Sequence, residues 1–589
     1  MEEVDWIPAL RPEDGFLARV YLKIDAVFER YKRWIQIVIA VLAFIGVHVY
    51  LGFAIAHNFK KAIAAIVITG LIYLTVAYFY ILKPGLKKLA PLLTPYKNGL
   101  FSIWNFEFLH IPLLKMGLFA GIIGAFLTWV VIDSAGQRIR LMSVAGLVMY
   151  LILSILVSAN PARIKWRPVI GGILLQFCVG LLVLRWPQGN QAFRWLSNQV
   201  VTFLDYTAKG TFFTYGFIAN PPSEICGFGS VFVYTSLQII IYFGAIVSVL
   251  YYLGVIEAVL SRIAWVMQYT VGTTAAESLN AAACIFLGQT EAAILIEPSL
   301  GTMTDSEIHA VMTAGFACIA GSLFSAYISF GACPQYLLSA TVMSAAVSLA
   351  VSKIIYPEIQ ESKQKDMKSF KFNSRGHNNV LECISDGAVH SAQFVAAITA
   401  NLIVYLALLA LLNSVLGFFG TLVDYPELTF NKILGYVFFP LAYMMGASDA
   451  VDPAVQIDET MKVAELMGMK TALNEFIAYQ QLSQWKSDGT LKGTRAQTIA
   501  TYALCGFSNI SMIGSQIGIL STMCPKRKSV FARVAVRALI AGTFSCFMTA
   551  CVAGILIDEP LSCNSAASNG CVRLERMNFN NTAEFDYEL

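Results

Sequence analysis

Long apolar blocks, each about the length needed to cross a bilayer, recur along the whole chain. About eleven runs of roughly 17 or more mainly apolar residues predict transmembrane helices. They cover residues 34–56, 62–82, 116–132, 141–157, 169–184, 231–253, 309–330, 336–351, 392–418, 498–520 and 534–555. Charged residues make up only 13% of the 589 residues, too few to cover the surface of soluble domains. The chain is therefore predicted to be an all-α polytopic membrane protein.

This composition excludes a disordered chain, a nucleic-acid binder and a secreted disulfide scaffold. The 12 cysteines form no CxxC pair or Cys/His metal motif. Several stand in apolar runs, which predicts buried, unreactive thiols at Cys178, Cys318, Cys505, Cys546 and Cys551. Residues 1–33 carry charges of both signs and lack the features of a cleaved signal peptide. We expect them to form a cytoplasmic N-terminal segment.

The distribution of Lys and Arg between the loops predicts the orientation. With a cytoplasmic N-terminus, the larger basic clusters fall on the inner side, as the positive-inside rule requires. They lie near residues 30–33, 83–88, 163–167, 363–371 and 526–528, whereas Lys60/Lys61 and Arg138/Arg140 would be outside. An odd number of spans places residues 558–589 outside. The Asn580 acceptor site for glycosylation and the Cys563/Cys571 pair agree with this prediction.

Two polar segments between short apolar arms point to a site inside the membrane. The first, near residues 272–300, contains Gln289, Thr290 and Glu291; the second, near residues 450–486, contains Glu475. Arms of this length cannot each cross about 30 Å of hydrocarbon. Each segment is therefore predicted to be a re-entrant helical hairpin that reaches into the membrane from one side.

Similar sequences follow the two hairpins. Gly315 begins Gly-Phe-Ala-Cys-Ile within one apolar run, and Gly506 begins Gly-Phe-Ser-Asn-Ile within another. By the predicted orientation, the first hairpin enters from the cytoplasm and the second from outside. A hairpin followed by a broken span, used twice in opposite orientations, is the inverted repeat of secondary transporters.

Simpler interpretations of these residues remain open at this stage. Gln289, Thr290 and Glu291 could form a solvated loop, and Glu475 could lie in an outer loop with Lys462, Lys470 and Lys486 around it. Asn509 could join helices, and Phe507 could serve packing alone. A membrane enzyme and a facilitative, channel-like permease are the other classes. The repetition of the pattern favours a transport site.

Several strings resemble the animal branch of the concentrative nucleoside transporter family. They are GQTE at 288–291, SEIHAVMTAGF at 306–316, AYISFG at 326–331, NEFIAYQQLS at 474–483, ATYALCGFSNI at 500–510 and VRALIAGT at 536–543. The resemblance covers about residues 141–557, expected to be the transporter core. Residues 34–140 are similar to the three additional N-terminal helices of the animal branch. Residues 558–589 would be an extracellular tail.

The resemblance implies a homotrimer in the plasma membrane whose transport domain moves by an elevator mechanism. Gln289, Thr290 and Glu291 would contact the nucleobase, and Glu475 and Asn509 the ribose hydroxyls, with Phe507 nearby. A carboxylate accepts hydrogen bonds from neighbouring hydroxyls, and amides both donate and accept. The Gly288–Gln289 pair is similar to members that accept both purine and pyrimidine nucleosides, such as adenosine and uridine.

The resemblance also implies a co-transported sodium ion and no other cofactor. Sodium would bind mainly to backbone carbonyls at Cys284, Leu287, Cys318 and Ile319. Family members commonly have Asn and a hydroxyl residue at the two cysteine positions, and a thiol is a poor ligand for a hard cation. Met512 also replaces a family serine. Proton coupling, with Glu291 or Glu475 as carrier, is therefore the alternative to sodium.

Overall fold

The computed structural model describes residues 131–219, 231–363, 379–422 and 427–560, together with 44–57 and scattered positions before 131. The chain divides into two compact units, Met1–Ala125 and Phe126–Leu589. In the first unit, Phe44–His57 is an apolar helix within the first predicted span. The predicted spans at 62–82 and 116–132 fall largely outside the described residues, as do Asn580, Cys563 and Cys571.

The described part of the second unit is built from helices, and seven are long and apolar enough to cross a membrane. All seven were predicted from the apolar blocks. They are α5 (Ile139–Leu156), α6 (Trp166–Gly180, continued to Arg185), α10 (Ile239–Tyr252, preceded by α9, Phe232–Thr235), α14 (Asp305–Ala317) with α15 (Phe324–Ser329), α16 (Pro334–Ile355), α17 (Val380–Thr421) and α23 (Lys528–Leu556, with one turn before it). The membrane fold class is thereby confirmed.

Both predicted hairpins are present as pairs of consecutive helices. The first is α12 (Ala275–Ala283) with α13 (Gln289–Leu300), and the second is α19 (Pro453–Ala472) with α20 (Glu475–Ser487). Local sequence sets their ends. Thr274 and Glu277 form a capping box at the start of α12, and Asn474 accepts a hydrogen bond of 3.0 Å from the Ile477 amide at the start of α20.

The predicted spans at 309–330 and 498–520 are both broken inside the protein. After α14 ends at Ala317, the backbone extends at Cys318 before α15 begins. The second is divided into α21 (Thr494–Leu504) and α22 (Ile510–Met523). Gly506 in this break has φ +147°, and a Cβ there would lie 2.9 Å from the carbonyl oxygen of Ala317. The two broken helices therefore meet at their breaks.

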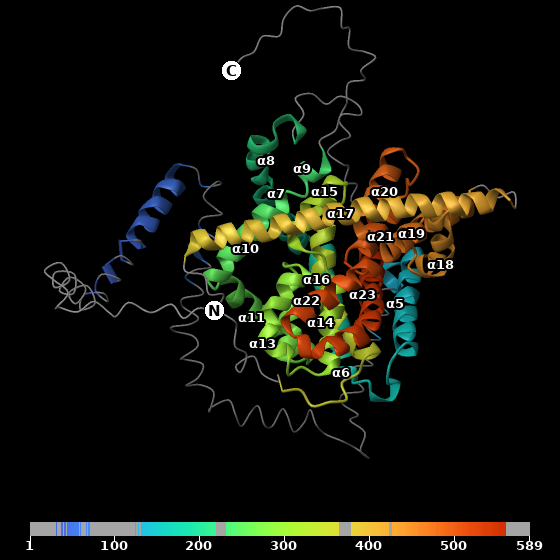
Figure 1. Cartoon of the computed structure of the whole chain (residues 1–589), viewed down its shortest axis with the longest axis horizontal. Coiled ribbons are helices and arrows are strands. Elements are labelled where there is room, and N and C mark those ends of the chain that lie inside the picture. Colours follow the sequence, from blue (N-terminus) through green and yellow to red (C-terminus); the bar gives the residue numbers. More distant parts are fainter. Residues whose placement is uncertain are drawn as a thin grey trace, which may run out of the picture. The chain divides into compact units, whose positions relative to one another are not determined.

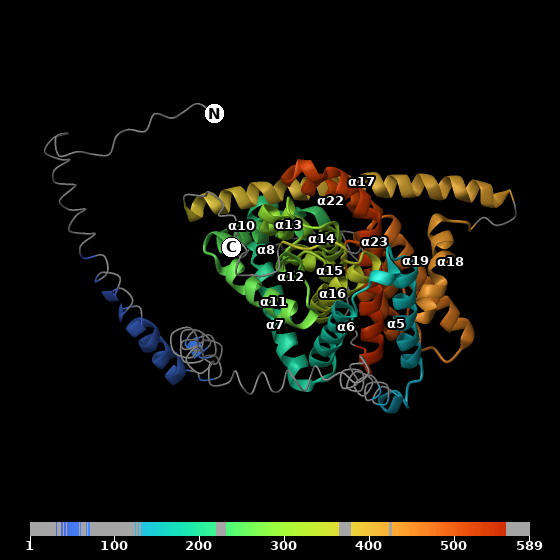
Figure 2. The same ribbon diagram turned by 90° about the horizontal axis from the view of Figure 1, so that it is seen from below.

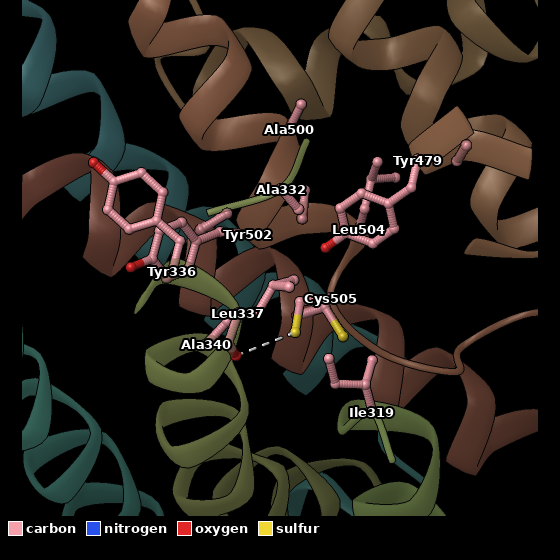
Figure 3. Close-up of a cluster of buried hydrophobic side chains, with 14 of the residues drawn as sticks. Ile319, Ala332, Tyr336, Leu337, Ala340, Tyr479, Ala500, Tyr502, Leu504 and Cys505 are labelled. Carbon is pink, nitrogen blue, oxygen red and sulfur yellow. Dashed lines mark hydrogen bonds between the residues drawn. The ribbon is translucent and has the colours of Figure 1, made fainter. Parts of the chain in front are cut away.

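Helices α14, α16 and α23 are the most deeply buried spans. Figure 3 shows part of the core where α16 packs against the end of α21. The thiol of Cys505 donates to the carbonyl oxygen of Leu337 over 3.8 Å. The prediction of buried thiols holds for Cys318, Cys505, Cys546 and Cys551, but it is wrong for Cys178, which is exposed on an outward face of α6.

The longest helix, α17, crosses the second unit as one straight rod in both ribbon views (Figures 1 and 2). It has 42 residues, and most of its side chains are exposed.

Two further helices, α7 (Pro187–Asp205) and α11 (Val255–Val271), were not among the predicted spans. A shorter apolar helix, α18 (Phe430–Met444), follows α17.

Candidate functional site

A cavity of about 440 Å³ lies between the first hairpin, the two helix breaks, α17 and α22. Its wall is mainly apolar, with a small number of polar side chains. This combination is typical of a pocket for a small organic ligand. The polar residues in the wall are Gln289, Thr290, Glu291, Ser322, His390, Ser391, Asn401, Ser515 and Thr522.

The first hairpin contributes its three predicted residues from the first turn of α13. Gln289, Thr290 and Glu291 all line the cavity. The amino end of a helix carries partial positive charge, which favours the Glu291 carboxylate there. Gly288 precedes them, and a Cβ at this position would lie 2.5 Å from Oε2 of Glu291. The glycine therefore allows the carboxylate to fold back over the start of the helix.

The second hairpin places Glu475 at the first position of α20, where it is completely buried. Its Oε1 accepts a hydrogen bond of 3.2 Å from the Tyr327 hydroxyl, and its Oε2 accepts one of 3.0 Å from Nδ2 of Asn509. The interpretation of Glu475 as part of a solvated loop is excluded by this burial. The carboxylate instead joins three elements, because Tyr327 lies on α15 and Asn509 precedes α22.

Asn509 has two roles in this arrangement. Its Oδ1 accepts a hydrogen bond of 3.0 Å from the Met512 amide and so caps α22. Its Nδ2 is then directed to Glu475. One asparagine therefore fixes the start of a helix and orients the buried carboxylate.

The six predicted ligand residues fall into two groups. Four of them, Gln289, Thr290, Glu291 and Phe507, line the cavity. Glu475 and Asn509 are hydrogen-bonded to each other and fully buried, and neither is among the residues that line the cavity. Their chain neighbours Phe476 and Phe507 are in the wall. Phe476 and Phe507 therefore connect the buried pair to the cavity along the chain.

The four predicted cation positions lie where the first hairpin turn meets the break after α14. Cys284, Leu287, Cys318 and Ile319 are all buried. The turn and the break are joined by a hydrogen bond of 3.1 Å from the Gly321 amide to the Phe286 carbonyl oxygen. Among the described residues, no group of three His, Cys, Asp or Glu side chains could hold a metal ion.

Some cavity and site residues were not predicted. Tyr327 stands in the AYISFG string, but nothing local links it to Glu475, which follows 148 residues later. On α17, His390, Ser391 and Asn401 line the cavity. These three residues could have been predicted from the sequence, because they are polar residues within or beside a long apolar run. Met512, noted as a departure from the family, also lines the cavity, and its sulfur accepts a hydrogen bond of 3.2 Å from Nε2 of Gln289.

Two hairpins and two broken helices around one cavity with a few polar side chains define a secondary-active membrane transporter. Three family models match the chain consecutively. They are the Na+ dependent nucleoside transporter N-terminus over residues 145–218, nucleoside recognition (Gate) over 233–333, and the Na+ dependent nucleoside transporter C-terminus over 336–554. The chain belongs to the Na+ dependent nucleoside transporter family.

Full-length relatives and solved structures agree with this assignment. Solute carrier family 28 member 3 of Homo sapiens is 39% identical over 94% of this chain and 78% of its own length. Sodium/nucleoside cotransporter 2 of Rattus norvegicus is 40% identical over 95% of this chain and 82% of its own. The structure of CNTnw in an inward-facing substrate-bound state is 33% identical, with a TM-score of 0.66 over 71% of this chain and 98% of that chain.

Proposed function

We propose that this protein is a symporter that uses the sodium gradient to carry both purine and pyrimidine nucleosides into the cell. The observation that carries the proposal is the arrangement of Glu291 and Glu475, one at the amino end of the second helix of each hairpin. One carboxylate lines the cavity and the other is held beside it by Tyr327 and Asn509. The family assignment makes nucleosides the expected ligands of this pair.

The residues around the cavity suit the two halves of a nucleoside. Gln289, Thr290 and Glu291 would hydrogen-bond the edge of the base, because together they offer donors and acceptors. Phe507 would pack against the ligand. Glu475 and Asn509 would accept and donate to the ribose hydroxyls once the wall opens. A free base lacks these hydroxyls, and a nucleotide adds negative charge next to two carboxylates, so both would be rejected.

Sodium would bind at the junction of the first hairpin turn and the α14 break. Backbone carbonyls of Cys284, Leu287, Cys318 and Ile319 are the proposed ligands, since carbonyl oxygens suit a hard cation and thiols do not. The 3.1 Å hydrogen bond between Gly321 and Phe286 supports this location, because it holds the turn and the break together. A bound ion would then stabilise the hairpin against the broken helix and favour the closed cavity.

We further propose a homotrimer in the plasma membrane, in which residues 141–557 form the core and move by an elevator mechanism. The N-terminus would be cytoplasmic and residues 558–589 extracellular. An ion-pair cluster supports a common side for three chain segments: Arg140 and Arg185 both pair with Asp133 and with Asp558. The buried Arg140 is thereby neutralised, which explains why a basic residue can lie on the proposed outer side.

Radiolabelled uptake in oocytes tests the function. Uridine and adenosine should each accumulate in sodium medium and inhibit each other's uptake, whereas choline medium should abolish accumulation. Uptake that follows external acidity in choline would assign the coupling to protons instead. Equilibration without accumulation would indicate the channel-like alternative. Transport of only one class of base would contradict the proposed selectivity and leave the symport mechanism intact.

A further inference from the structure

Met512, in the first turn of α22, contacts the residue that begins α13 of the first hairpin. Its sulfur accepts a hydrogen bond of 3.2 Å from Nε2 of Gln289, and both side chains line the cavity of about 440 Å³. Helices α13 and α22 lie side by side in both ribbon views (Figures 1 and 2). The contact therefore joins the first hairpin to the second broken helix at the wall of the cavity.

The chemistry of the sulfur determines which end of the amide faces it. A thioether sulfur carries no hydrogen and can only accept, so Gln289 turns its NH2 group toward Met512 and its oxygen away. An amide without such a partner can rotate by half a turn and exchange its donor and acceptor ends, because the two ends have nearly the same shape. At Gln289 the reversed amide would place two acceptors, oxygen and sulfur, against each other. Met512 therefore fixes the orientation of the amide.

The amide oxygen that is turned away has no protein partner. Oε1 of Gln289 is buried and accepts no hydrogen bond from the described residues, and the same is true of the neighbouring Thr290 hydroxyl. On α14, the Gln289 side chain packs beside Gly315, where an added Cβ would lie 3.1 Å from Cβ of Gln289. A glycine offers no side-chain donor. A buried acceptor without a donor is costly. Both unpaired atoms belong to residues of the cavity wall, which indicates that a ligand supplies their partners.

We propose that Met512 is a positioning residue that sets the base specificity of the cavity, because it holds Gln289 with its oxygen free to accept a hydrogen bond from the ligand. This inference rests on the proposed function, since it takes the ligand to be a nucleoside whose base meets Gln289. The base must then present an N–H donor to this oxygen. Uracil supplies a ring N–H and adenine an exocyclic amino group, so one amide orientation serves both classes of base. A base edge with acceptors alone would leave the buried oxygen unpaired and bind weakly.

Adenosine and purine riboside are a matched pair of ligands for the test. Purine riboside lacks only the exocyclic amino group, and its ring nitrogens accept but do not donate. The readout is the ratio of Kd for purine riboside to Kd for adenosine, measured by calorimetry on the purified protein in sodium buffer. Because an unpaired buried acceptor is costly, we expect a wild-type ratio of roughly tenfold. Met512→Leu keeps a side chain of similar size and removes the acceptor. The amide can then reverse and donate to purine riboside, so the ratio should fall to near one.

The fall in this ratio should come from tighter binding of purine riboside, with the Kd for adenosine nearly unchanged. Damage to the fold does not produce a gain in affinity for one ligand, so this result separates positioning from structure. Met523→Leu is the matched control, because it makes the same chemical change at the last residue of α22, which is not in the cavity wall. It should keep the wild-type ratio. An unchanged ratio in Met512→Leu, or an equal loss of affinity for both ligands, would overturn the proposal.

A double substitution tests whether Met512 acts through Gln289. Gln289→Ala removes the amide and should give a low ratio, and adding Met512→Leu should not change that ratio further. A further change would show that Met512 acts on the ligand directly, contrary to the proposal. The wild-type ratio does not depend on the folding of any variant. If wild-type cells show no sodium-dependent uridine uptake, the proposed function fails. If that uptake is normal but the wild-type ratio is near one, the Met512 inference alone fails.

Discussion

The hydroxyl of Tyr327 on α15 donates a hydrogen bond to Oε1 of Glu475 on α20, with 3.2 Å between the two oxygens. This contact joins the broken helix of the first half to the hairpin of the second. The two rings nearest to it, Phe476 and Tyr479, lie 5.1 and 4.8 Å from the Tyr327 ring, measured between centroids. The buried carboxylate is therefore oriented by a side chain from the opposite repeat.

Replacing Tyr327 with Phe should weaken nucleoside binding. The substitution keeps the ring packing and removes one of two neutral side-chain donors to a buried carboxylate, worth about 1.5–3 kcal/mol for a charged acceptor. We expect the KM for uridine to rise roughly tenfold or more at a normal surface level. Tyr479→Phe, which loses a bond of 2.7 Å to the Thr501 carbonyl oxygen, is the control and should change KM much less. Equal KM values in the two variants would argue against the role of Tyr327.

Neutralising either hairpin carboxylate should abolish or severely reduce uptake. Glu291→Gln and Glu475→Gln are nearly isosteric, so the protein should still reach the cell surface, as biotinylation would show. Both carboxylates are buried or in the cavity wall, where a charge is costly unless it is used. Glu427→Gln is a suitable control, because that carboxylate is exposed and paired with Lys432 over 2.5 Å. Normal uptake in both site variants would disprove the site assignment.

Gly506→Ala should destabilise the protein. The residue has φ +147°, and its new Cβ would lie 2.5 Å from the Cys546 sulfur. Such a backbone conformation alone costs about 1–3 kcal/mol for a non-glycine residue. We expect a lower unfolding temperature in detergent and less protein at the surface. Gly514→Ala in α22 meets nothing within 4 Å and should be neutral or slightly stabilising.

The buried Lys353–Glu277 pair should show strong coupling in a double-mutant cycle. Lys353→Met alone leaves a buried carboxylate without its cation and should cost about 3–5 kcal/mol. Glu277→Gln preserves a capping side chain for α12 and leaves the ammonium beside Glu358. The double variant should be more stable than the sum of the single losses by about 0.5–3 kcal/mol. Additive losses in unfolding temperature would show that the pair does not interact.

The orientation of the chain can be tested at its C-terminal end. Because Asp558 belongs to the same charge cluster as Arg140 and Arg185, we expect the following tail to be extracellular. Asn580 lies outside the described residues, but its glycosylation should be lost in Asn580→Gln, as a mobility change after glycosidase treatment would show. A tag after Leu589 should bind antibody on intact cells. Binding only after permeabilisation would reverse the orientation.

Much of the fold was predictable because membrane insertion imposes a simple length requirement. The seven apolar helices coincide with predicted spans, and the polar segments at Gln289 and Glu475 are the starts of hairpin helices. The exception in length is α17, which begins at Val380, twelve residues before the predicted span at 392. Its first turns contain the charged residues Glu382 and Asp386. Hydrophobicity alone therefore predicts a loop there rather than the start of a transmembrane helix.

The site was less predictable, because its key contacts join distant parts of the chain. No local pattern reveals that Tyr327 meets Glu475. Lys470 was interpreted with Lys462 and Lys486 as one of the lysines around a possible outer loop. The structure shows that Lys462 is paired with Asp458 near the surface, whereas Lys470 is buried. Sequence identifies a lysine as charged, but only tertiary packing determines whether water or protein surrounds that charge.

The cavity wall includes polar side chains from both the first hairpin and α17, and this affects how drug-like nucleosides should behave. Gln289 and Thr290 belong to the first hairpin, whereas His390, Ser391 and Asn401 belong to α17. If the hairpin moves as the proposed elevator mechanism requires, a compact ligand held by the hairpin alone would travel with it. An analogue with a substituent that also contacts α17 would bridge the first hairpin and α17 and would hinder movement of one relative to the other. Contact of that substituent with His390 and Asn401 should therefore distinguish an inhibitor from a transported nucleoside.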